Sequence, residues 1–343
     1  MSQQFASDNN AGICPAALEA MLRANAAGHA PAYGDDAWTA EAKDRAGRLF
    51  ETEADVFLVF NGTAANGLAL AQICRPYHAV IAHRHSHIES DEAGAAGFFS
   101  GGAKLLTADT PLAKLTPEAV EMLAAPGRGV HHVKPRALSL TQATELGTVY
   151  SVEEIEALTA VARRQGLKVH MDGARLANAI ATLGRPPADV TWRAGVDVLC
   201  FGGVKNGLAV GELIMFFDRA LAEEFGWRMK QAGQLNAKMR LVAAAWIGLM
   251  ENGVWLDNAH HANAMARRLA GRLAELDGIR LMHPVEANAV FVEIPADLQA
   301  KLRRQGWRFH TFLGDRGCRL MCAWDTSPET VDRFADDLAA AIN

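Results

Sequence analysis

The sequence predicts an α/β protein with one large, mostly parallel sheet and a small α+β unit near its C-terminal end. Short apolar runs alternate with helical patterns through most of the chain, which is typical of a parallel sheet covered by helices. The last part of the chain, about 90 residues, has the pattern of a small domain. Half of the residues are hydrophobic and 21% are charged, so the chain can fill a sizeable core.

The expected elements follow from these patterns in chain order. In the large unit we predict strands at 56–60, 79–82, 104–107, 137–140, 168–171, 196–200 and 213–217. Helices are expected at 64–74, 117–124, 152–165, 174–183, 241–250 and 254–276. Ser151 and Glu154 fit a capping box at the start of one of them.

The tail of the chain predicts two strands, a helix, two further strands and a final helix. Their ranges are 280–283, 289–293, 296–305, 308–312, 319–322 and 328–341. We therefore expect three parts: an N-terminal segment at 1–14, a large domain at 15–250 and a small C-terminal domain at 251–343.

Bulk composition excludes several classes of protein. The net charge of -5 argues against a nucleic-acid binder, which needs a basic surface. No apolar run reaches the roughly 20 residues of a membrane span, and the first residues do not resemble a secretory signal. The five cysteines form no CxxC pair, and Cys74 and Cys200 lie in apolar runs, which indicates buried thiols in a reducing compartment. We expect a cytoplasmic protein with no nucleic-acid or membrane partner.

Two charged residues stand where buried strands should end. Asp172 follows the run at 168–171, and Lys205 follows the run at 196–200 after two glycines. Ligands of open α/β sheets bind beyond the carboxyl ends of the strands. A lysine there can form a Schiff base, and an acid can pair with a pyridinium nitrogen. Together they predict a site for pyridoxal 5'-phosphate (PLP).

Two nearby motifs allow more than one interpretation. Gly62 and Thr63 follow the first predicted strand, where a helix N-terminus could bind a phosphate, although Thr63 could also be an ordinary helix cap. His83, His85 and His87 alternate, so on a strand they would share a face and could bind a metal. No further ligand is evident, so we expect no metal and consider one imidazole stacked on a cofactor ring instead.

Taken in order, six motifs resemble the threonine aldolase group of the aspartate-aminotransferase fold, the fold type I PLP enzymes. The likeness covers nearly the whole chain and is closest to the low-specificity L-threonine aldolases and L-phenylserine aldolases. The motifs are Phe-Ala-Ser-Asp-Asn at 5–9, Tyr-Gly-Asp-Asp at 33–36, Gly-Thr-Ala-Ala-Asn at 62–66, Ser-His-Ile at 86–88 followed by Glu92, Asp-Gly-Ala-Arg at 172–175, and Lys-Asn-Gly at 205–207.

The resemblance implies a role for each residue around the cofactor. Lys205 would form the Schiff base with PLP, and Asp172 would pair with the pyridine nitrogen. His87 would stack on the ring, while Gly62 and Thr63 would hold the phosphate. Lys205, His87 and Asp172 would therefore be the catalytic residues.

The resemblance also implies how the substrate is held. Arg175, Arg319 and Ser7 would bind the substrate carboxylate, and Arg175 would also lie near the cofactor. The planar fork of an arginine matches a carboxylate in two bonds.

Residues of a neighbouring subunit are expected in each site. Tyr33 would reach the substrate there, and Lys238 or Arg240 would reach the cofactor. The resemblance therefore implies a homodimer or homotetramer with shared active sites.

The chain departs from the family pattern at three places, and at one of them neither Lys238 nor Arg240 is an unambiguous counterpart of the family's partner-subunit arginine. Val204 precedes the lysine where the family often has Ser or Thr, and we expect backbone N–H groups of Gly202 and Gly203 to replace the lost hydroxyl contact to the phosphate. The loop at 141–144 reads Thr-Gln-Ala-Thr where some members carry a histidine. The base that takes the β-hydroxyl proton is thus left open between His87 and a bound water.

The implied reaction is a retro-aldol cleavage of L-β-hydroxy-α-amino acids to glycine and an aldehyde. The substrates would be L-threonine, L-allo-threonine and L-phenylserine, with strict selection at the α-carbon and little at the β-carbon. Another PLP β-eliminating lyase, an aminotransferase and a PLP-binding protein without turnover are the alternatives.

Overall fold

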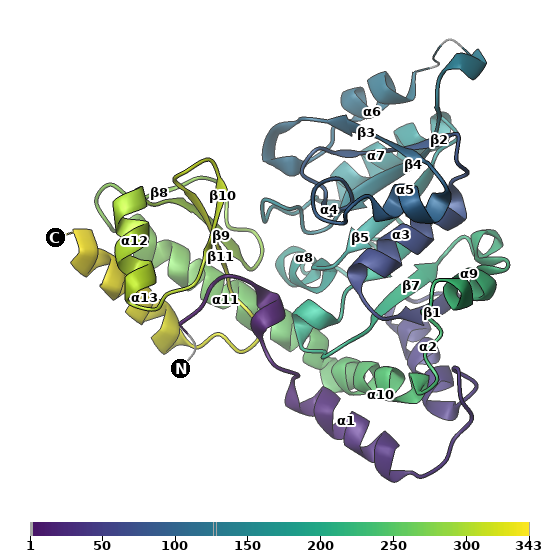
Figure 1. Cartoon of the computed structure of the whole chain (residues 1–343), viewed down its shortest axis with the longest axis horizontal. Helices are drawn as coiled ribbons and strands as arrows, with labels where there is room; N and C mark the ends of the chain where they lie inside the picture. Colours follow the sequence, from purple (N-terminus) through teal and green to yellow (C-terminus); the bar gives the residue numbers. More distant parts are fainter. Residues whose placement is uncertain (1–2, 126, 128, 343) are drawn as a thin grey trace.

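The larger part of the molecule is built on a seven-stranded sheet. The computed structural model describes residues 3–125, 127 and 129–342 (Figure 1). The sheet has the order β1-β7-β6-β5-β4-β2-β3. β2 to β6 run parallel where they pair, and β7 is antiparallel to both of its neighbours. The bounds are β1 (Asp55–Val59), β2 (His78–His83), β3 (Lys104–Ala108), β4 (Lys134–Thr141), β5 (Lys168–Gly173), β6 (Val198–Phe201) and β7 (Glu212–Phe216), so each predicted strand is confirmed with small shifts.

Alternate residues of these strands fill two separate cores, one on each face of the sheet. Leu199 belongs to one core, and its neighbour Val198 belongs to the other. This division follows from the two-residue period of a strand, and it explains why the central strands β5 to β7 are buried along nearly their whole length. Both faces are thereby closed to water, and the ends of the strands remain as the place for a site.

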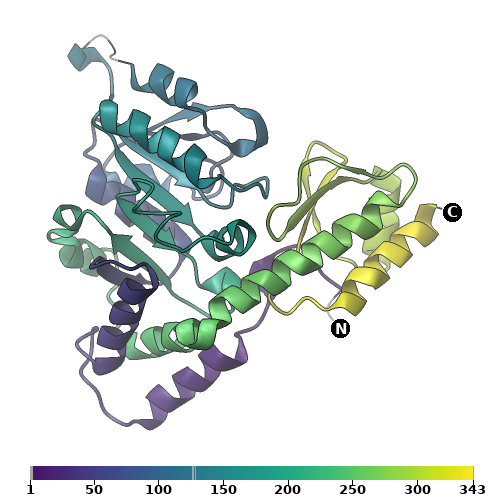
Figure 2. The ribbon, with the colours of Figure 1, turned by 180° about the vertical axis from the view of Figure 1, so that it is seen from behind.

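Helices cover both faces (Figures 1 and 2). Ser151 and Glu154 form the predicted capping box of α7. The helices are α1 (Pro15–Ala26), α2 (Ala37–Leu49), α3 (Gly62–Ile73), α4 (His87–Ser90), α5 (Ala95–Ser100), α6 (Pro117–Ala124), α7 (Val152–Arg164), α8 (Leu176–Leu183), α9 (Phe225–Gln231) and α10 (Met239–Met250). The sequence analysis had not predicted α1, α2, α4, α5 or α9.

The C-terminal part has its own antiparallel sheet and core. Its strands have the order β10-β11-β9-β8, and α11 runs diagonally from the large sheet to this unit (Figure 2). The bounds are α11 (Val254–Ala274), β8 (Arg280–Leu281), β9 (Ala289–Glu293), α12 (Ala296–Arg304), β10 (His310–Leu313), β11 (Gly317–Met321) and α13 (Pro328–Ile342). The predicted order of elements is confirmed, and the domain boundary near residue 250 stays a prediction.

The N-terminal segment lies against the C-terminal unit. The Phe5 N–H donates to Arg308 O at 2.8 Å, and the Met321 N–H donates to Phe5 O at 2.8 Å. The Phe5 ring is fully buried beside Trp307 and Phe334. The segment then passes through a short 3-10 helix, η1 (Asp8–Asn10), toward the large sheet. Residues 1–2 and 343, which belong to the outer predicted segments, lie outside the described residues.

The cysteines and the helices also bear on the expected cellular environment. All five cysteines are buried free thiols, as predicted. Among residues 3–125, 127 and 129–342, no helix has both the length and the apolar character of a membrane span.

Candidate active site

A pocket of about 210 Å³ lies beyond the carboxyl ends of β5 and β6. Five of the predicted site residues line it, and they come from separate parts of the sheet and its helices. These residues are Gly62, Thr63, His87, Asp172 and Lys205. The sheet topology brings them together because Asp172 ends β5, Lys205 follows β6, and α3 and α4 begin next to the same edge.

A buried hydrogen-bond network joins Asp172 to His87. Asn66 donates from its amide nitrogen to Asp172 Oδ2 at 2.8 Å and to Glu92 Oε1 at 2.8 Å. His87 Nδ1 lies 2.8 Å from the same Glu92 oxygen. The Ala174 N–H donates to Asp172 Oδ1 at 2.9 Å, so both oxygens of this carboxylate are held. Asp172 therefore has a fixed orientation at the floor of the pocket.

The Glu92 contact also changes the charge balance of His87. The hydrogen bond that His87 donates to Glu92 raises the pKa of His87, although partial burial acts in the opposite direction. Burial raises the pKa of Glu92, against the hydrogen bonds from His87 and Asn66. Both groups therefore keep a proton to higher pH than they would in water.

Lys205 is carried by a short 3-10 turn, η4 (Val204–Asn206), that a buried acid holds. The Gly203 N–H donates to Glu212 Oε2 at 2.5 Å, and the Gly202 N–H donates to Gly173 O at 3.0 Å. The expectation that these two N–H groups replace a hydroxyl contact to a phosphate is therefore wrong. Burial raises the pKa of Glu212 to about 7, despite the Gly203 hydrogen bond and the charge of Lys205.

The N-terminus of α3 points at the same pocket. Asn61 is the cap, because its side-chain oxygen accepts from the Ala64 N–H at 2.9 Å. The alternative interpretation of Thr63 as the cap is thus wrong. The first N–H groups of a helix have no partner within it, and the helix dipole favours an anion there. Gly62 and Thr63 are consequently available for a phosphate.

A second cluster of charges lies next to the pocket. Arg175 donates from Nε and Nη2 to the two oxygens of Asp8, at 2.7 and 3.0 Å. Asn288 adds a hydrogen bond to Asp8 Oδ2 at 3.0 Å. Burial alone would raise the pKa of Asp8, but Arg175 outweighs it and lowers the pKa to about 2. Asp8 thus occupies two of the donors that the sequence analysis had reserved for a substrate carboxylate.

Arg319 is the less occupied of the two arginines. It stacks on Phe312 with 4.8 Å between the guanidinium carbon and the ring centre, and its Nε is buried without a hydrogen-bond partner in the part of the chain that the structure describes. Burial, together with the nearby charge of Arg175, lowers the pKa of Arg319. Ser7 directly precedes Asp8 in the sequence. Its hydroxyl accepts from the Asn9 N–H at 3.1 Å as the cap of η1.

The three residues assigned to a neighbouring site are separate from this pocket. Tyr33 is half exposed and carries Lys230 over its ring at 4.6 Å. Its N–H donates to Ala237 O, immediately before Lys238 at the N-terminus of α10. Arg240 has a buried Nε with no hydrogen-bond partner among the described residues. None of Tyr33, Lys238 and Arg240 lines the Lys205 pocket of this chain.

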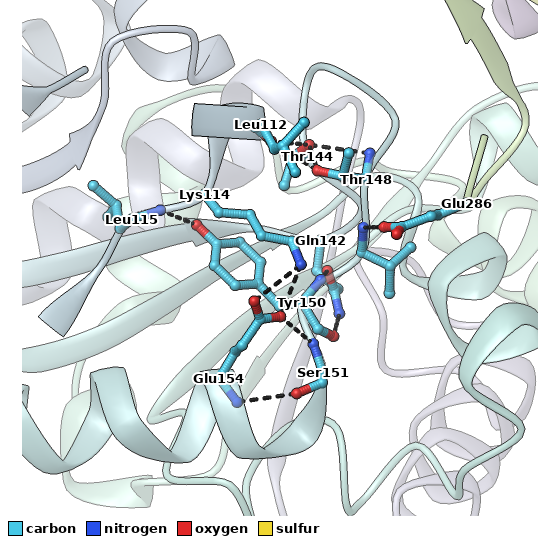
Figure 3. A network of polar contacts seen from close by, with 11 residues as sticks. Leu112, Lys114, Leu115, Gln142, Thr144, Thr148, Tyr150, Ser151, Glu154 and Glu286 are labelled. Atoms are coloured by element: carbon cyan, nitrogen blue, oxygen red, sulfur yellow. Dashed lines mark hydrogen bonds and ion pairs between the residues drawn. The ribbon is translucent and has the colours of Figure 1, made fainter. Parts of the chain in front are cut away.

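The loop after β4 is tied to both sheets (Figure 3). Gln142 bonds the backbone of Tyr150 through both ends of its side chain, and its own N–H donates to Asp172 O at 2.8 Å. The hydroxyls of Thr144 and Thr148 bond each other at 2.7 Å. Glu286, from the C-terminal unit, accepts from the Val149 N–H at 2.7 Å. The Thr144 hydroxyl is thus engaged by Thr148 and by the backbone of Leu112.

The three alternating histidines do not share a strand face. His83 ends β2 and contacts Thr110 O at 3.0 Å, whereas His87 begins α4. The described ranges contain no group of three or more His, Cys, Asp or Glu side chains that could hold a metal ion.

Sequence reasoning missed four polar residues of the site: Asn66, Asp8, Glu212 and, as a partner of His87, Glu92. Asn66 could have been found as a lone amide in the first turns of an otherwise apolar helix. Glu212 could have been found as an acid that opens a fully buried strand. No local signal links Asp8 to Arg175, because the contact is tertiary.

The donor set of the pocket fits PLP. It offers an amine (Lys205), a buried carboxylate (Asp172), an imidazole (His87) and a helix N-terminus, which are the partners of the aldehyde, the ring nitrogen, the ring face and the phosphate. The fold and this pocket define a fold type I PLP enzyme.

Comparisons with known proteins agree with this class. A low specificity L-threonine aldolase from a Pseudomonas species is 53% identical, covering 100% of this chain and 99% of the relative. One from Pseudomonas aeruginosa is 54% identical, covering 98% of this chain and 97% of the relative. The solved structure of a Leishmania major threonine aldolase has a TM-score of 0.93 at 31% identity and covers 99% of both chains. The model of the beta-eliminating lyase family matches residues 4–297, and the chain belongs to this family, in its low-specificity L-threonine aldolase branch.

Proposed function

We propose that this enzyme cleaves the Cα–Cβ bond of L-β-hydroxy-α-amino acids and releases glycine and an aldehyde. The observation that carries the proposal is the Lys205–Asp172–His87 pocket together with Arg319, a partly buried arginine whose buried Nε has no partner among the described residues. A charged group of this kind favours an anionic ligand, and an amino acid supplies a carboxylate. The substrates are L-threonine, L-allo-threonine and L-phenylserine.

Each residue of the pocket has one task in this proposal. Lys205 binds the cofactor covalently, Asp172 holds a proton at its ring nitrogen, and the N–H groups of Gly62 and Thr63 bind its phosphate. His87 lies against the ring. PLP, when bound, supplies a ring that accepts the electrons of the broken bond.

The substrate carboxylate is bound by Arg319, with support from the remaining Nη1 of Arg175 and from Ser7. Asp8 holds Arg175 by Nε and Nη2, so Arg319 is the stronger candidate for a two-bond contact. A fixed carboxylate decides which bond of the α-carbon is cleaved, which is a positioning effect. Selection is therefore strict at the α-carbon, whereas the β-hydroxyl has no evident dedicated partner in the loop after β4.

The site is completed by a second copy of the chain, in a homodimer or homotetramer. Tyr33, Lys238 and Arg240 lie away from their own pocket, and Phe60 and Trp227 are large apolar side chains exposed by 60% and 78%. A contact with a second copy of the chain would remove these two side chains from water. Sedimentation of the active enzyme tests this, and an active monomer contradicts it. The five buried free thiols support a cytoplasmic location.

Product analysis of the purified holoenzyme tests the reaction. We expect glycine and the matching aldehyde from L-threonine, L-allo-threonine and L-phenylserine, and no comparable turnover of D-threonine. Ammonia with a keto acid would identify a β-eliminating lyase, and a requirement for an amino acceptor would identify an aminotransferase. Bound cofactor without any product would identify a binding protein.

A further inference from the structure

Glu92 is a buried acid next to the pocket for which the proposed reaction has no task. Its side chain is fully buried, and its carboxylate lies between His87 and Asn66. Its second oxygen, Oε2, has no hydrogen-bond partner among the residues that the structure describes. An acid in such a place costs folding free energy, so a compensating role at the site is expected.

The network determines which nitrogen of His87 carries the proton. Asn66 bonds two carboxylates, so the atom that faces them must be its amide nitrogen, and Glu92 Oε1 must be an acceptor. His87 Nδ1 lies 2.8 Å from that same oxygen, so Nδ1 is the donor. In the neutral imidazole the lone pair is then on Nε2, the nitrogen that is not tied to the network.

We propose that Glu92 is a positioning residue that holds the proton on Nδ1 of His87 and turns Nε2 outward as the proton-accepting atom for the β-hydroxyl. Asn66 connects Glu92 to Asp172, because its amide nitrogen donates to both carboxylates. A base that is oriented by a buried acid is a recurring arrangement in enzymes. This inference rests on the proposed function in one respect: the β-hydroxyl of the substrate is taken as the group that gives its proton to Nε2.

Other charged groups face His87 as well, and they do not have the same effect. Asp91 Oδ2 lies 3.5 Å from Nε2, but its side chain is 82% exposed and is screened by water. Glu145 and Asp172 favour the protonated imidazole through their charge, and Lys205 opposes it. Glu92 alone among these groups makes a short, partly buried hydrogen bond to the ring.

The matched variants are Glu92→Gln and Asp91→Asn, which each remove one acid next to one ring nitrogen. Imidazole nitrogen NMR of the cofactor-free protein follows the pKa and the tautomer of His87, with His87→Gln used to assign its signals. In Glu92→Gln we expect the pKa to fall back toward the ordinary 6.5, because a neutral amide no longer favours the imidazolium. In Asp91→Asn we expect no comparable change.

Kinetics of the holoenzyme give the second readout. We expect Glu92→Gln to lower kcat about tenfold or more with KM changed less than about twofold, and to move the acidic limb of the kcat profile to lower pH. An unchanged pKa and tautomer in Glu92→Gln would overturn the proposal. If that variant does not fold, a proton on Nε2 in the neutral wild-type imidazole overturns it instead. The NMR result does not depend on turnover, so it separates this inference from the proposed reaction.

Discussion

The residues that face the cofactor belong to the large sheet and its helices, whereas the charges beside them come from three distant parts of the chain. Asp172 lies in β5, Lys205 in the turn after β6 and Asn66 in α3, and Glu92 supports them from the loop after α4. Asp8, Arg175 and Arg319 are placed by the N-terminal segment, the start of α8 and β11. The first group needs only one folded sheet. The second group exists only when both sheets and the N-terminal segment are assembled, so the two sides should respond differently to mutation.

The largest effect is expected on the cofactor side, from Lys205→Ala. Loss of the amine removes the covalent attachment of the cofactor, so turnover should fall by at least about 10³-fold while the fold is kept. Borohydride reduction of the wild-type holoenzyme followed by peptide mapping identifies the attached lysine. Lys104→Ala, at an exposed position of β3, is the control and should keep its activity. Labelling at a lysine other than Lys205 would refute the assignment of the pocket.

Arg319→Gln should have the next largest effect, on the substrate side. Removing the charged partner of a carboxylate costs about 3 kcal/mol, so kcat/KM should fall about 10²-fold, mainly through a higher KM. Cofactor content, measured by visible absorbance, should stay the same because Arg319 does not line the Lys205 pocket. A variant that loses cofactor but keeps its KM would reverse the proposed division between the two sides.

Asp8→Asn should lower the free energy of unfolding and leave the affinity for the cofactor nearly unchanged, because Asp8 does not line the Lys205 pocket. The substitution leaves the Arg175 guanidinium buried without its counter-charge, and breaking a buried pair costs about 3 to 5 kcal/mol. The wild type should also lose stability in acid. Because folding lowers the pKa of Asp8 from 3.8 to about 2, this contribution is complete above about pH 4 and is lost as the pH falls toward 2.

The size of this acid effect is about 2 kcal/mol. It can be measured as the difference in unfolding free energy between pH 5 and pH 2 in wild type and in Asp8→Asn, where it should be absent. An equal acid dependence in both proteins would show that Asp8 is not the titrating group.

The smallest effect is expected where the two sides meet, from Glu286→Ala. This change removes the acceptor of the Val149 N–H and should cost about 1 to 2 kcal/mol in the free energy of unfolding. Tyr150→Phe is a matched control, because its hydroxyl accepts from the Leu115 N–H within the large unit (Figure 3). Only Glu286→Ala should also raise KM, since of these two side chains Glu286 is the one that bonds the loop from the C-terminal unit. Equal effects on KM would contradict this.

The cofactor side was also the more predictable side. Asp172 and Lys205 are marked by charges at the ends of apolar strands, and the helix that begins at Gly62 follows such a strand directly. These are local signals in the sequence. The order of the parallel strands then brings the marked residues to one edge of the sheet. The Asp8 contact with Arg175 and the Gly203 contact with Glu212 were not predictable, because a hydrogen-bond partner is chosen by tertiary packing rather than by neighbours in sequence.

Helices were missed for a different reason. α1 begins with Pro15 at its first position and is rich in alanine, so its local signal was present but was not used. α4 and α5 are only four and six residues long, and helices this short depend on the surrounding structure rather than on their own propensity.

The strand-like pairing of Phe5 with Arg308 and Met321 has a consequence for the making of the protein. Phe5 leaves the ribosome long before Arg308 and Met321, its backbone partners. The large sheet can form while translation continues, but Phe5 must wait in solvent until β11 has emerged. The core of the C-terminal unit and the placement of Asp8 beside Arg175 are therefore late, coupled events. A bulky fusion directly before Phe5 would be expected to delay both.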